Sequence, residues 1–558
     1  MSEKNYFKTP LAENIFRQKY AQGPGDTWRN LAERVVEDVC GSQGGESPPL
    51  MSKDDRQQLV EYITDMKFIP GGRYLYYAGR GLKAFSNCYL IRAETDTREE
   101  WAKVVGKAMG YLSLGGGIGI DYSVLRERGK ALRRTGGKAS GPIPLMFAVN
   151  EIGRNVMQGG SRRSAIYASL TWQHGDVQDF LTAKNWGKQE VVPGVTLEDA
   201  KKHNFNYPAP LDMTNISVNY DDAFLQEVEK NQALPETFIT NVRQALSTSE
   251  PGFSFNFGKH GRETLRNACT EVTSEDTDDS CNLGSVNMGN ISSIEEFHDV
   301  VSLGAKFLVC GSIRAILPYD EAYKVREKNR RIGLGLMGIH EWLLQRKMNY
   351  ECTPELHKWL SVYRDQSTKA AHEHCDHLFI SRCVATRAIA PTGTIGILAS
   401  TTTGIEPLFA VAYKRRYLTD GTRWRYEFVV DATASRLIHD FGIHPDSIET
   451  AQSLANNYEQ RIRFQADVQD YVDMAISSTI NLPSWGSDRN NDDLVRPFAH
   501  TLYSYAPRLR GFTCYADGSR GGQPITEVPY EEATRHRGVV FDEVDICDIT
   551  GRGGSCGT

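Results

Sequence analysis

Short apolar runs alternate with helix-like segments over most of the chain, from about residue 68 to residue 530. The apolar runs include NCYLI (87–91) and SAIYASLTW (164–172), and amphipathic stretches such as residues 98–113 separate them. Strands that alternate with helices favour parallel pairing, which buries both faces of a sheet. The pattern therefore predicts an α/β fold with parallel strands.

The two ends of the chain have a different character. Apolar residues at three-to-four spacing in LAENIFRQKYAQ and DDRQQLVEYITDM predict a helical N-terminal region over residues 1–70. The C-terminal CDITGRGGSCGT has too few apolar residues to pack a core, so we expect residues 536–558 to form a flexible tail. Residues 71–535 are expected to form the main domain. A polar stretch within it, residues 184–214, predicts a functional loop or an excursion over the surface.

Charge and cysteine content exclude several classes of protein. The formal net charge is −6, which provides no basic field for nucleic acid. No apolar run approaches the roughly 20 residues that span a bilayer, and the N-terminus lacks the apolar stretch of a secretion signal. The eleven cysteines are scattered and odd in number, unlike a secreted disulfide framework. We expect a cytoplasmic protein that acts on neither membranes nor nucleic acid.

Two motifs resemble ligand-binding signatures but do not match their spacing. HEHCDH (372–377) offers several metal ligands, but its histidines lack the i, i+4 spacing that directs two imidazoles at one zinc. A solvated helix face is the preferred interpretation, and no metal site is predicted. LGGGIGIDYS fits neither the dinucleotide fingerprint nor the phosphate loop. Its glycines are more typical of a backbone that approaches a ligand or turns sharply.

The stretch APTGTIGILASTTTGIEP (390–407) predicts a phosphate site. A strand end that leads through Thr-Gly-Thr into a helix start offers unpaired backbone N–H groups and several hydroxyls. An ordinary tight turn is the alternative.

Three cysteines could share one site. On an extended segment, alternate side chains share a face, which would place Asn267, Cys269 and Glu271 on one side. Cys88 and Cys281 each lie in a strand-like run, and they could approach to disulfide distance if those strands are neighbours. Simple core cysteines are the alternative interpretation.

Six motifs occur in the order found in the large subunit of ribonucleotide reductases, between about Phe68 and Pro524. They are FSNCYLI with GGGIGIDYSVLRERG, NACTE with CNLGSVN, NISVNYDDAF, NRRIGLGLMGIHEWL, APTGTIGIL and GFTCYADGSRGGQP. The chain most resembles the class II, adenosylcobalamin-dependent branch, although NACTE replaces the more usual Asn-Pro-Cys-Gly-Glu. The resemblance implies a ten-stranded α/β barrel with a central finger loop that carries Cys269 at its tip.

The resemblance also implies the chemistry. Cys269 would become a thiyl radical that removes the 3′-hydrogen of a ribonucleotide, Glu271 would act as base on the 3′-hydroxyl, and Asn267 would hydrogen-bond the ribose. Cys88 and Cys281 would supply reducing equivalents and end as a disulfide. The substrate phosphates and neighbouring groups would be held by Ser86, Asn87, Gly116, Gly117, Pro391, Thr392, Gly393, Thr394 and Ile395.

Partners follow from the same resemblance. Cys547 and Cys556 in the tail would exchange thiols with the spent disulfide and be reduced by thioredoxin or glutaredoxin. A deoxynucleotide effector would bind near Asp121 and Arg126, carried by the loop after DYSVLRERG and by the segment between Lys184 and Asn215. The chain would act as a monomer or homodimer, on ribonucleoside di- or triphosphates.

The radical source is inferred from one broken motif. Class I relatives pass a radical through two adjacent tyrosines, but here Tyr515 is followed by Ala516. Adenosylcobalamin is therefore the expected cofactor. The alternatives are a class I-like subunit that needs a separate metal-containing radical generator, and a nucleotide-binding regulatory barrel without chemistry.

Overall fold

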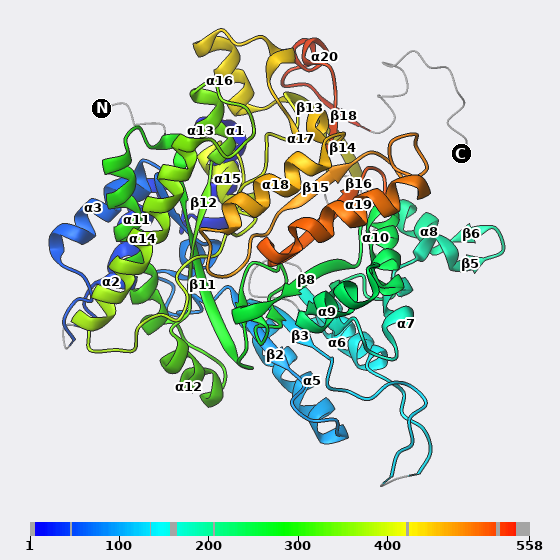
Figure 1. Ribbon diagram of the computed structural model, residues 1–558. Coiled ribbons are helices and arrows are strands. Elements are labelled where there is room, and N and C mark those ends of the chain that lie inside the picture. Colours follow the sequence, from blue (N-terminus) through cyan, green and yellow to red (C-terminus); the bar gives the residue numbers. More distant parts are fainter. Residues whose placement is uncertain are drawn as a thin grey trace.

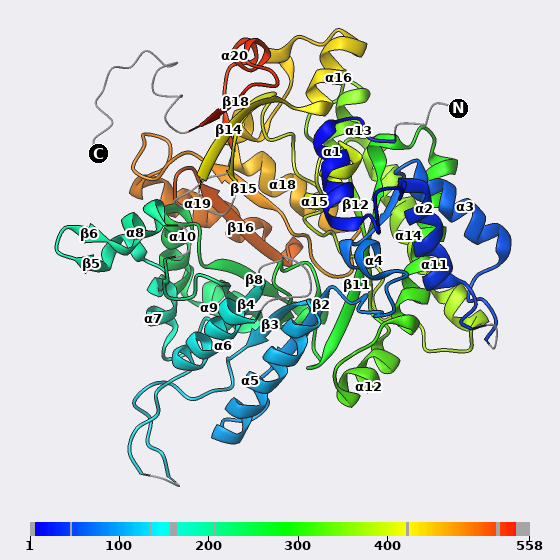
Figure 2. The same ribbon diagram turned by 180° about the vertical axis from the view of Figure 1, so that it is seen from behind.

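The computed structural model describes residues 6–44, 47–133, 136–156, 164–204, 207–419, 423–519 and 525–542. Its centre is a ten-stranded sheet, and helices surround it in both views (Figures 1 and 2). This confirms the predicted mixed α/β fold with ten strands. No helix in the described part of the chain has the length and apolar character needed to cross a membrane.

The first half of the sheet contains five strands in successive parallel pairs. These are β2 (Cys88–Arg92), β3 (Gly117–Asp121), β4 (Ile166–Thr171), β7 (Thr214–Asp221) and β8 (Gly252–Asn256). The connecting helices are α5 (Arg98–Ser113), α6 (Ile143–Asn155), α7 (Val177–Thr182), α8 (Leu197–His203), α9 (Asp222–Asn231) and α10 (Glu236–Thr248). Nearly every strand residue is buried, as expected of parallel strands that are covered on both faces.

The second half runs antiparallel to the first. Its named strands are β11 (Asp279–Asn287), β12 (Ile332–Met337), β15 (Thr479–Leu482) and β16 (Gly511–Ala516). β11 pairs antiparallel with β2, and β16 pairs antiparallel with β8. Isolated parallel bridges Leu334–Arg387 and Ile389–Ile476 connect β12, through segment 387–389, to the residues just before β15. The strand pairings therefore form a ring with two halves, which meet where β11 pairs with β2 and where β16 pairs with β8.

Helices of the second half pack outside this ring. They are α11 (Ile294–Arg314), α12 (Asp320–Asn329), α13 (Ile339–Gln345), α14 (Pro354–His377), α15 (Gly393–Ala399), α16 (Ala432–Phe441), α17 (Ala451–Leu454), α18 (Tyr458–Gln469) and α19 (Asp492–Tyr505). The short α15 matters most for the site, because it follows segment 387–389 directly.

The N-terminal helices pack against the second half of the ring, where α2 and α3 contact α11 and α1 contacts α15 (Figures 1 and 2). They are α1 (Pro10–Ile15), α2 (Trp28–Cys40), α3 (Lys53–Thr64) and α4 (Gly72–Tyr77), and β1 (Phe68–Pro70) pairs with β11. One hydrophobic core joins these helices to the barrel and includes Trp28, Phe68, Leu308 and Trp342. The domain bounds at residues 70 and 535 stay predictions.

Two small sheets lie outside the ring. β5 (Glu190–Val192) and β6 (Val195–Thr196) form a hairpin that projects from the molecule within the predicted polar excursion (Figure 1). β13 (Ala412–Thr419), β14 (Arg423–Val430), β17 (Ile525–Glu527) and β18 (Val540–Asp542) form a four-stranded sheet beside α20 (Tyr530–Arg535). β18 lies within the predicted tail, and residues 543–558 are outside the described residues.

The finger loop connects β8 to β11. Its stem is a two-stranded ladder of β9 (Leu265–Arg266) and β10 (Thr273–Ser274). The stem passes so close to β3 that a Cβ atom on Gly119 would lie 1.6 Å from the carbonyl oxygen of Arg266. Glycine at position 119 is therefore what allows the finger to lie against the barrel wall.

Candidate active site

A cavity of about 380 Å³ lies between the finger tip, the ends of β2 and β3, and the start of α15. Its lining contains most of the predicted site residues. Those that line it are Asn87, Cys88, Gly117, Asn267, Cys269, Glu271, Pro391, Thr392, Gly393, Thr394 and Ile395. The structure thus brings together residues from three distant parts of the sequence.

The finger tip is a tight turn. Thr270 has a positive φ of 71°, and its N–H donates a 3.0 Å hydrogen bond to the carbonyl of Asn267. The expected extended segment with alternating faces is therefore wrong, because the chain reverses at residues 268–270. The turn nevertheless directs Asn267, Cys269 and Glu271 into one cavity. Cys269 is exposed, whereas Asn267 and Glu271 are 2% and 1% exposed.

Asn267 links the finger to the barrel wall. Its Nδ2 donates a 3.0 Å hydrogen bond to the Sγ of Cys88, and its Oδ1 accepts one of 3.0 Å from the N–H of Val272. The tip is also held from β7, where Asn215 Nδ2 donates to the carbonyl of Ala268 at 3.0 Å. Together these bonds fix the turn and the orientation of the Cys88 thiol.

Glu271 is a buried carboxyl group with spare hydrogen-bonding capacity. Its Oε2 has no hydrogen-bond partner among the described residues. Burial raises the pKa of Glu271 to about 7, although hydrogen bonds, including one with Asn267, act in the opposite direction. A carboxyl group with a pKa near neutrality can accept and return a proton at physiological pH.

Cys88 and Cys281 are direct neighbours across the seam between β2 and β11. The two residues are Cα partners in the antiparallel register, so the predicted strand adjacency is confirmed. Both side chains are buried thiols. Burial raises the pKa of both cysteines well above the ordinary value, and the nearby carboxylate of Glu271 adds to the effect. Both therefore stay protonated at neutral pH.

The residues that precede α15 form the opposite wall. Thr392 has a positive φ of 52°, and its Oγ1 accepts a 2.8 Å hydrogen bond from the N–H of Gly404. The next residues, Gly393 to Ile395, form the first turn of α15, where backbone N–H groups have no acceptor within the helix. A Cβ on Gly393 would contact nothing within 4 Å, so there is open space on this side.

Three of the predicted catalytic and substrate-binding residues do not line the cavity. Ser86 is buried, a Cβ on Gly116 would lie 2.2 Å from the ring of Tyr89, and Cys281 is buried opposite Cys88. Sequence reasoning also missed residues that do line it, chiefly Gly71, Gly72 and Arg73, whereas Gly115 belongs to the glycines that were expected to approach a ligand or turn sharply. The glycine pair in FIPGGRY was the available signal. Gly115 has a positive φ of 84°, and a Cβ there would lie 2.2 Å from the Nη1 of Arg73.

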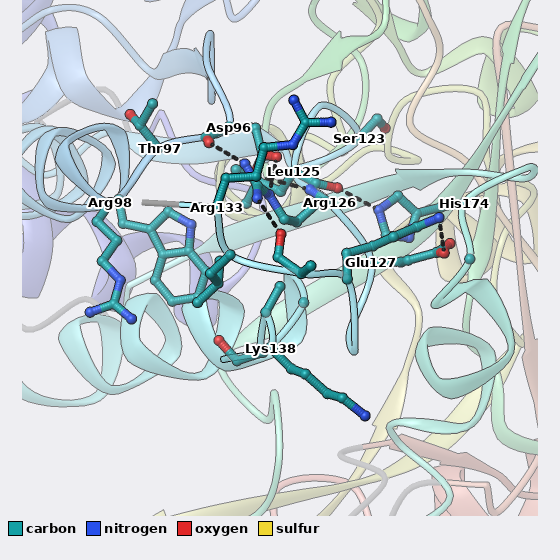
Figure 3. Close-up of a pocket in the computed structure, with 18 of the residues that line it drawn as sticks. Asp96, Thr97, Arg98, Ser123, Leu125, Arg126, Glu127, Arg133, Lys138 and His174 are labelled. Atoms are coloured by element: carbon teal, nitrogen blue, oxygen red, sulfur yellow. Dashed lines mark hydrogen bonds and ion pairs between the residues drawn. The ribbon is translucent and has the colours of Figure 1, made fainter. Parts of the chain in front are cut away.

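A second, larger cavity of about 1440 Å³ lies beyond the C-terminal ends of β3 and β4 (Figure 3). Arg126 lines it, and its backbone N–H donates to Oδ1 of Asp96 at 3.1 Å. Basic side chains are numerous in the lining, which includes Arg98, Arg126, Lys130, Arg133 and Lys138.

Asp121 is separate from the lining of this larger cavity. It lies in a smaller cavity of about 410 Å³. There it accepts hydrogen bonds from Ser123 and, at 2.7 Å, from Thr264. The two residues predicted to hold an effector therefore line different cavities.

The remaining motifs give no metal site. The described residues contain no cluster of three or more side chains that could ligate a metal ion. In HEHCDH, His374 is buried and its Nε2 lies 3.3 Å from the Sγ of Cys310, so this helix face is not wholly solvated as expected. Cys547 and Cys556 lie outside the described residues.

Comparison with known proteins gives one consistent result. Residues 86–246, 254–360 and 381–515 match the family described as "Ribonucleotide reductase, barrel domain". The chain is 26% identical to a vitamin B12-dependent ribonucleoside-diphosphate reductase of Mycobacterium tuberculosis, over 92% of this chain and 80% of that one. It is 24% identical to the protein of that name from Thermoplasma acidophilum, over 84% and 66% of the two chains. It is 26% identical to a putative adenosylcobalamin-dependent ribonucleoside-triphosphate reductase of Mycobacterium phage D29, over 75% and 67%.

Proposed function

Because the chain belongs to the ribonucleotide reductase family, we propose that it reduces ribonucleotides to 2′-deoxyribonucleotides by a thiyl-radical mechanism with adenosylcobalamin as radical source. The observation that carries the proposal is the cavity in which Cys269, Asn267, Glu271 and Cys88 face the start of α15. A nucleotide with its ribose at the finger tip and its phosphates at α15 would contact all of them.

Cys269, Glu271 and Asn267 on the finger loop each have a different role in the reaction of the ribose. The Cys269 sulfur, as a radical, takes the 3′-hydrogen atom, and Glu271 removes the proton of the 3′-hydroxyl. The 2′-hydroxyl then leaves as water after it gains a proton. Glu271 must be ionised to act first, and its pKa of about 7 allows it to be ionised and to be reprotonated within one cycle. Asn267 positions the ribose and the Cys88 thiol together.

Cys88 and Cys281 supply the two electrons. Hydrogen donation requires S–H bonds, and the raised pKa of both cysteines keeps them as thiols. Their facing positions on β2 and β11 allow them to join as a disulfide when both hydrogens are spent. Cys269 recovers its hydrogen at the end and is unchanged over the cycle.

The phosphates bind at Thr392, Gly393, Thr394 and Ile395, next to Pro391. Backbone N–H groups in the first turn of α15 and the Thr394 hydroxyl are the donors, and Asn87 and Gly117 close the opposite side. Ser86 and Gly116 do not contact the phosphates directly, and they position the backbone of the lining residues next to them. The same donors suit a diphosphate or a triphosphate.

Cys269 is accessible to a cofactor, which is the feature that fits adenosylcobalamin. It is exposed, while Ala165, Gly117 and Ala268 beside it in the lining are small. When bound, the cofactor supplies the species that removes the hydrogen atom from the Cys269 thiol. The late strand β16 also lacks the adjacent tyrosines that a partner-driven radical would use, since Ala516 follows Tyr515 at its end.

The larger cavity is the place for a deoxynucleotide effector. Its lining has more basic than acidic side chains, which suits phosphates, and Arg126 is the predicted effector residue that it contains. Asp121 would act only indirectly, through Ser123, which lines both cavities. Figure 3 shows the basic side chains that surround this space.

Regeneration of the dithiol is assigned to Cys547 and Cys556, with thioredoxin or glutaredoxin as reductant in the cytoplasm. Support comes from the position of β18, which pairs with β14 and so connects the start of this segment to the folded part of the chain. Whether the chain is a monomer or a homodimer does not affect this assignment.

An anaerobic assay tests the proposed function. Purified enzyme, adenosylcobalamin, a small dithiol and either CDP or CTP should give the deoxynucleotide, and Cys269→Ser should give none while it still binds substrate. Failure of the wild type with adenosylcobalamin, together with activity after addition of a metal-containing radical-generating subunit, would favour the class I alternative.

A further inference from the structure

Two cysteines outside the active site lie in contact beneath a surface loop. The Sγ atoms of Cys375 and Cys383 are 3.9 Å apart. Cys375 is near the end of α14 and 0% exposed, whereas Cys383 is 5% exposed. Neither lines the cavity that contains Cys269, and the proposed reaction uses neither.

The loop between them is held from several sides. Arg330 donates from Nε to the carbonyl of Ser381 at 3.0 Å, and the N–H of Val384 donates to the carbonyl of Asn329 at 2.9 Å. The Nε2 of His372 lies 3.0 Å from the carbonyl oxygen of Cys383. The sulfur contact is therefore preorganised, and disulfide formation requires the two sulfurs to move from 3.9 Å to roughly 2 Å apart.

The contact makes the two sulfurs chemically different. The hydrogen bond from Cys383 and, less strongly, the charge of Arg330 lower the pKa of Cys375. The same contact raises the pKa of Cys383. Because the thiolate is the reactive form, Cys375 is the attacking sulfur and Cys383 is the resolving one.

We propose that Cys375 and Cys383 are a second redox-active dithiol, distinct from Cys88 and Cys281, which closes to a disulfide on reaction with hydrogen peroxide. The Cys375 thiolate attacks one peroxide oxygen, the O–O bond breaks, and the released hydroxide takes a proton and leaves as water. The Cys383 sulfur attacks the resulting sulfenic acid. Its S–O bond breaks, and hydroxide leaves with the Cys383 proton as a second water. Two electrons pass from the thiols to the peroxide.

This disulfide would connect α14 to the strand that closes the ring. Cys383 lies just before segment 387–389, which runs on to the phosphate-binding residues at the start of α15. Oxidation would therefore restrain the backbone that leads to the active site, without contact with the substrate.

Peptide mapping tests the proposal directly, because trypsin cleaves after Lys369, Arg382 and Arg387 and so separates the two cysteines. The full chain is treated with one equivalent of hydrogen peroxide, quenched in acid, alkylated and digested. The expected product is AAHEHCDHLFISR joined to CVATR, two hydrogens lighter than the two reduced peptides and separated by dithiothreitol. Recovery of both peptides in alkylated form, or with Cys375 as sulfinic acid, would overturn the proposal.

Two variants sharpen the test. Cys383→Ser should lose the linked pair and leave Cys375 to oxidise further, to sulfinic acid. Cys352→Ser is the matched control, because burial raises the pKa of Cys352 to about 12, and this variant should keep the linked pair. The measurement on the wild type does not depend on either variant folding. It is also independent of the reductase assay, so failure of one leaves the other interpretable.

Discussion

The side-chain amide of Asn267 donates a 3.0 Å hydrogen bond to the Sγ of Cys88 and so joins the finger loop to β2. The same side chain accepts a hydrogen bond from Val272 N–H on the other side of the turn. One residue therefore connects the finger tip that carries Cys269 to the thiol of Cys88. This relationship makes Asn267 the most informative position to change.

Asn267→Ala should lower kcat by about 10²-fold, because the ribose and the Cys88 thiol lose their common partner. It should also lower the free energy of unfolding by about 1–3 kcal/mol, since Val272 N–H is left buried and unpaired. Steady-state kinetics and urea unfolding measure the two effects. Asn215→Ala removes a different bond to the same tip and should lower stability with a much smaller change in kcat. Equal kinetic losses in both variants would contradict a specific role for Asn267.

The pH dependence of activity should follow Glu271. With the carboxylate as the proposed base, kcat/KM should rise with pH through an apparent pKa near 7. Glu271→Gln should reduce activity by about 10²–10⁴-fold and remove this rise. A rate profile of the wild type that is flat between pH 6 and 8 would exclude Glu271 as the titrating base.

The free energy of unfolding should also depend on pH through Glu271, and it should fall as the pH rises. Burial raises the pKa of Glu271 from 4.5 to about 7, so folding favours the neutral carboxyl group. The resulting contribution is fully present below pH 4.5 and is lost as the pH rises through 7, at a cost of about 3 kcal/mol. Relative to wild type, Glu271→Gln should therefore gain melting temperature at pH 8 and not at pH 5. Thermal denaturation at both pH values checks this.

Gly119→Ala should displace the finger loop, because the added methyl group would overlap the carbonyl of Arg266. We expect a loss of about 3 kcal/mol or more in unfolding free energy and very low activity. Gly106→Ala in α5 is the matched control, since a Cβ there contacts nothing within 4 Å and alanine favours helix. Chemical denaturation should show that the unfolding free energy falls in Gly119→Ala and rises in Gly106→Ala, relative to wild type.

Thr394→Val tests the phosphate site. Loss of a hydroxyl hydrogen bond to a charged phosphate should raise KM by about 10-fold or more with little change in kcat. Thr392→Val should behave differently, because its Oγ1 already accepts from Gly404 N–H, and it should lose stability as well. An unchanged KM in Thr394→Val would place the phosphates elsewhere.

The arrangement of strands was largely predictable, whereas the local backbone at the site was not. Alternating strands and helices, each with a clear hydrophobic period, predicted the α/β fold, and the register of β2 and β11 places Cys88 opposite Cys281 as expected. The finger tip differed because a positive φ at Thr270, a residue with no strong preference for that conformation, reverses the chain. The contact from Asn215 on β7 helps to hold the turn, and no short sequence pattern encodes it.

Long-range contacts explain the other differences. Arg73 reaches the cavity only because its side chain lies close to Gly115, just before β3, and its position in the sequence gives no sign of this contact. Asp121 and Arg126 are close in the chain, yet the turn after β3 directs them into separate cavities. Cys375 belongs to HEHCDH, for which a solvated helix face was expected, and only the path of the loop brings its sulfur to that of Cys383.

The antiparallel seam between β2 and β11 is short, with three paired residues, and one of those pairs is Cys88 with Cys281. A disulfide bond between their sulfurs would therefore covalently cross-link one half of the barrel to the other. Such a cross-link would close a loop of nearly 200 residues, which in the chain-entropy treatment is worth about 5 kcal/mol against unfolding. The disulfide form of the enzyme should be the more heat-resistant one. Each reduction of this disulfide would remove the cross-link between β2 and β11 before the next nucleotide is processed.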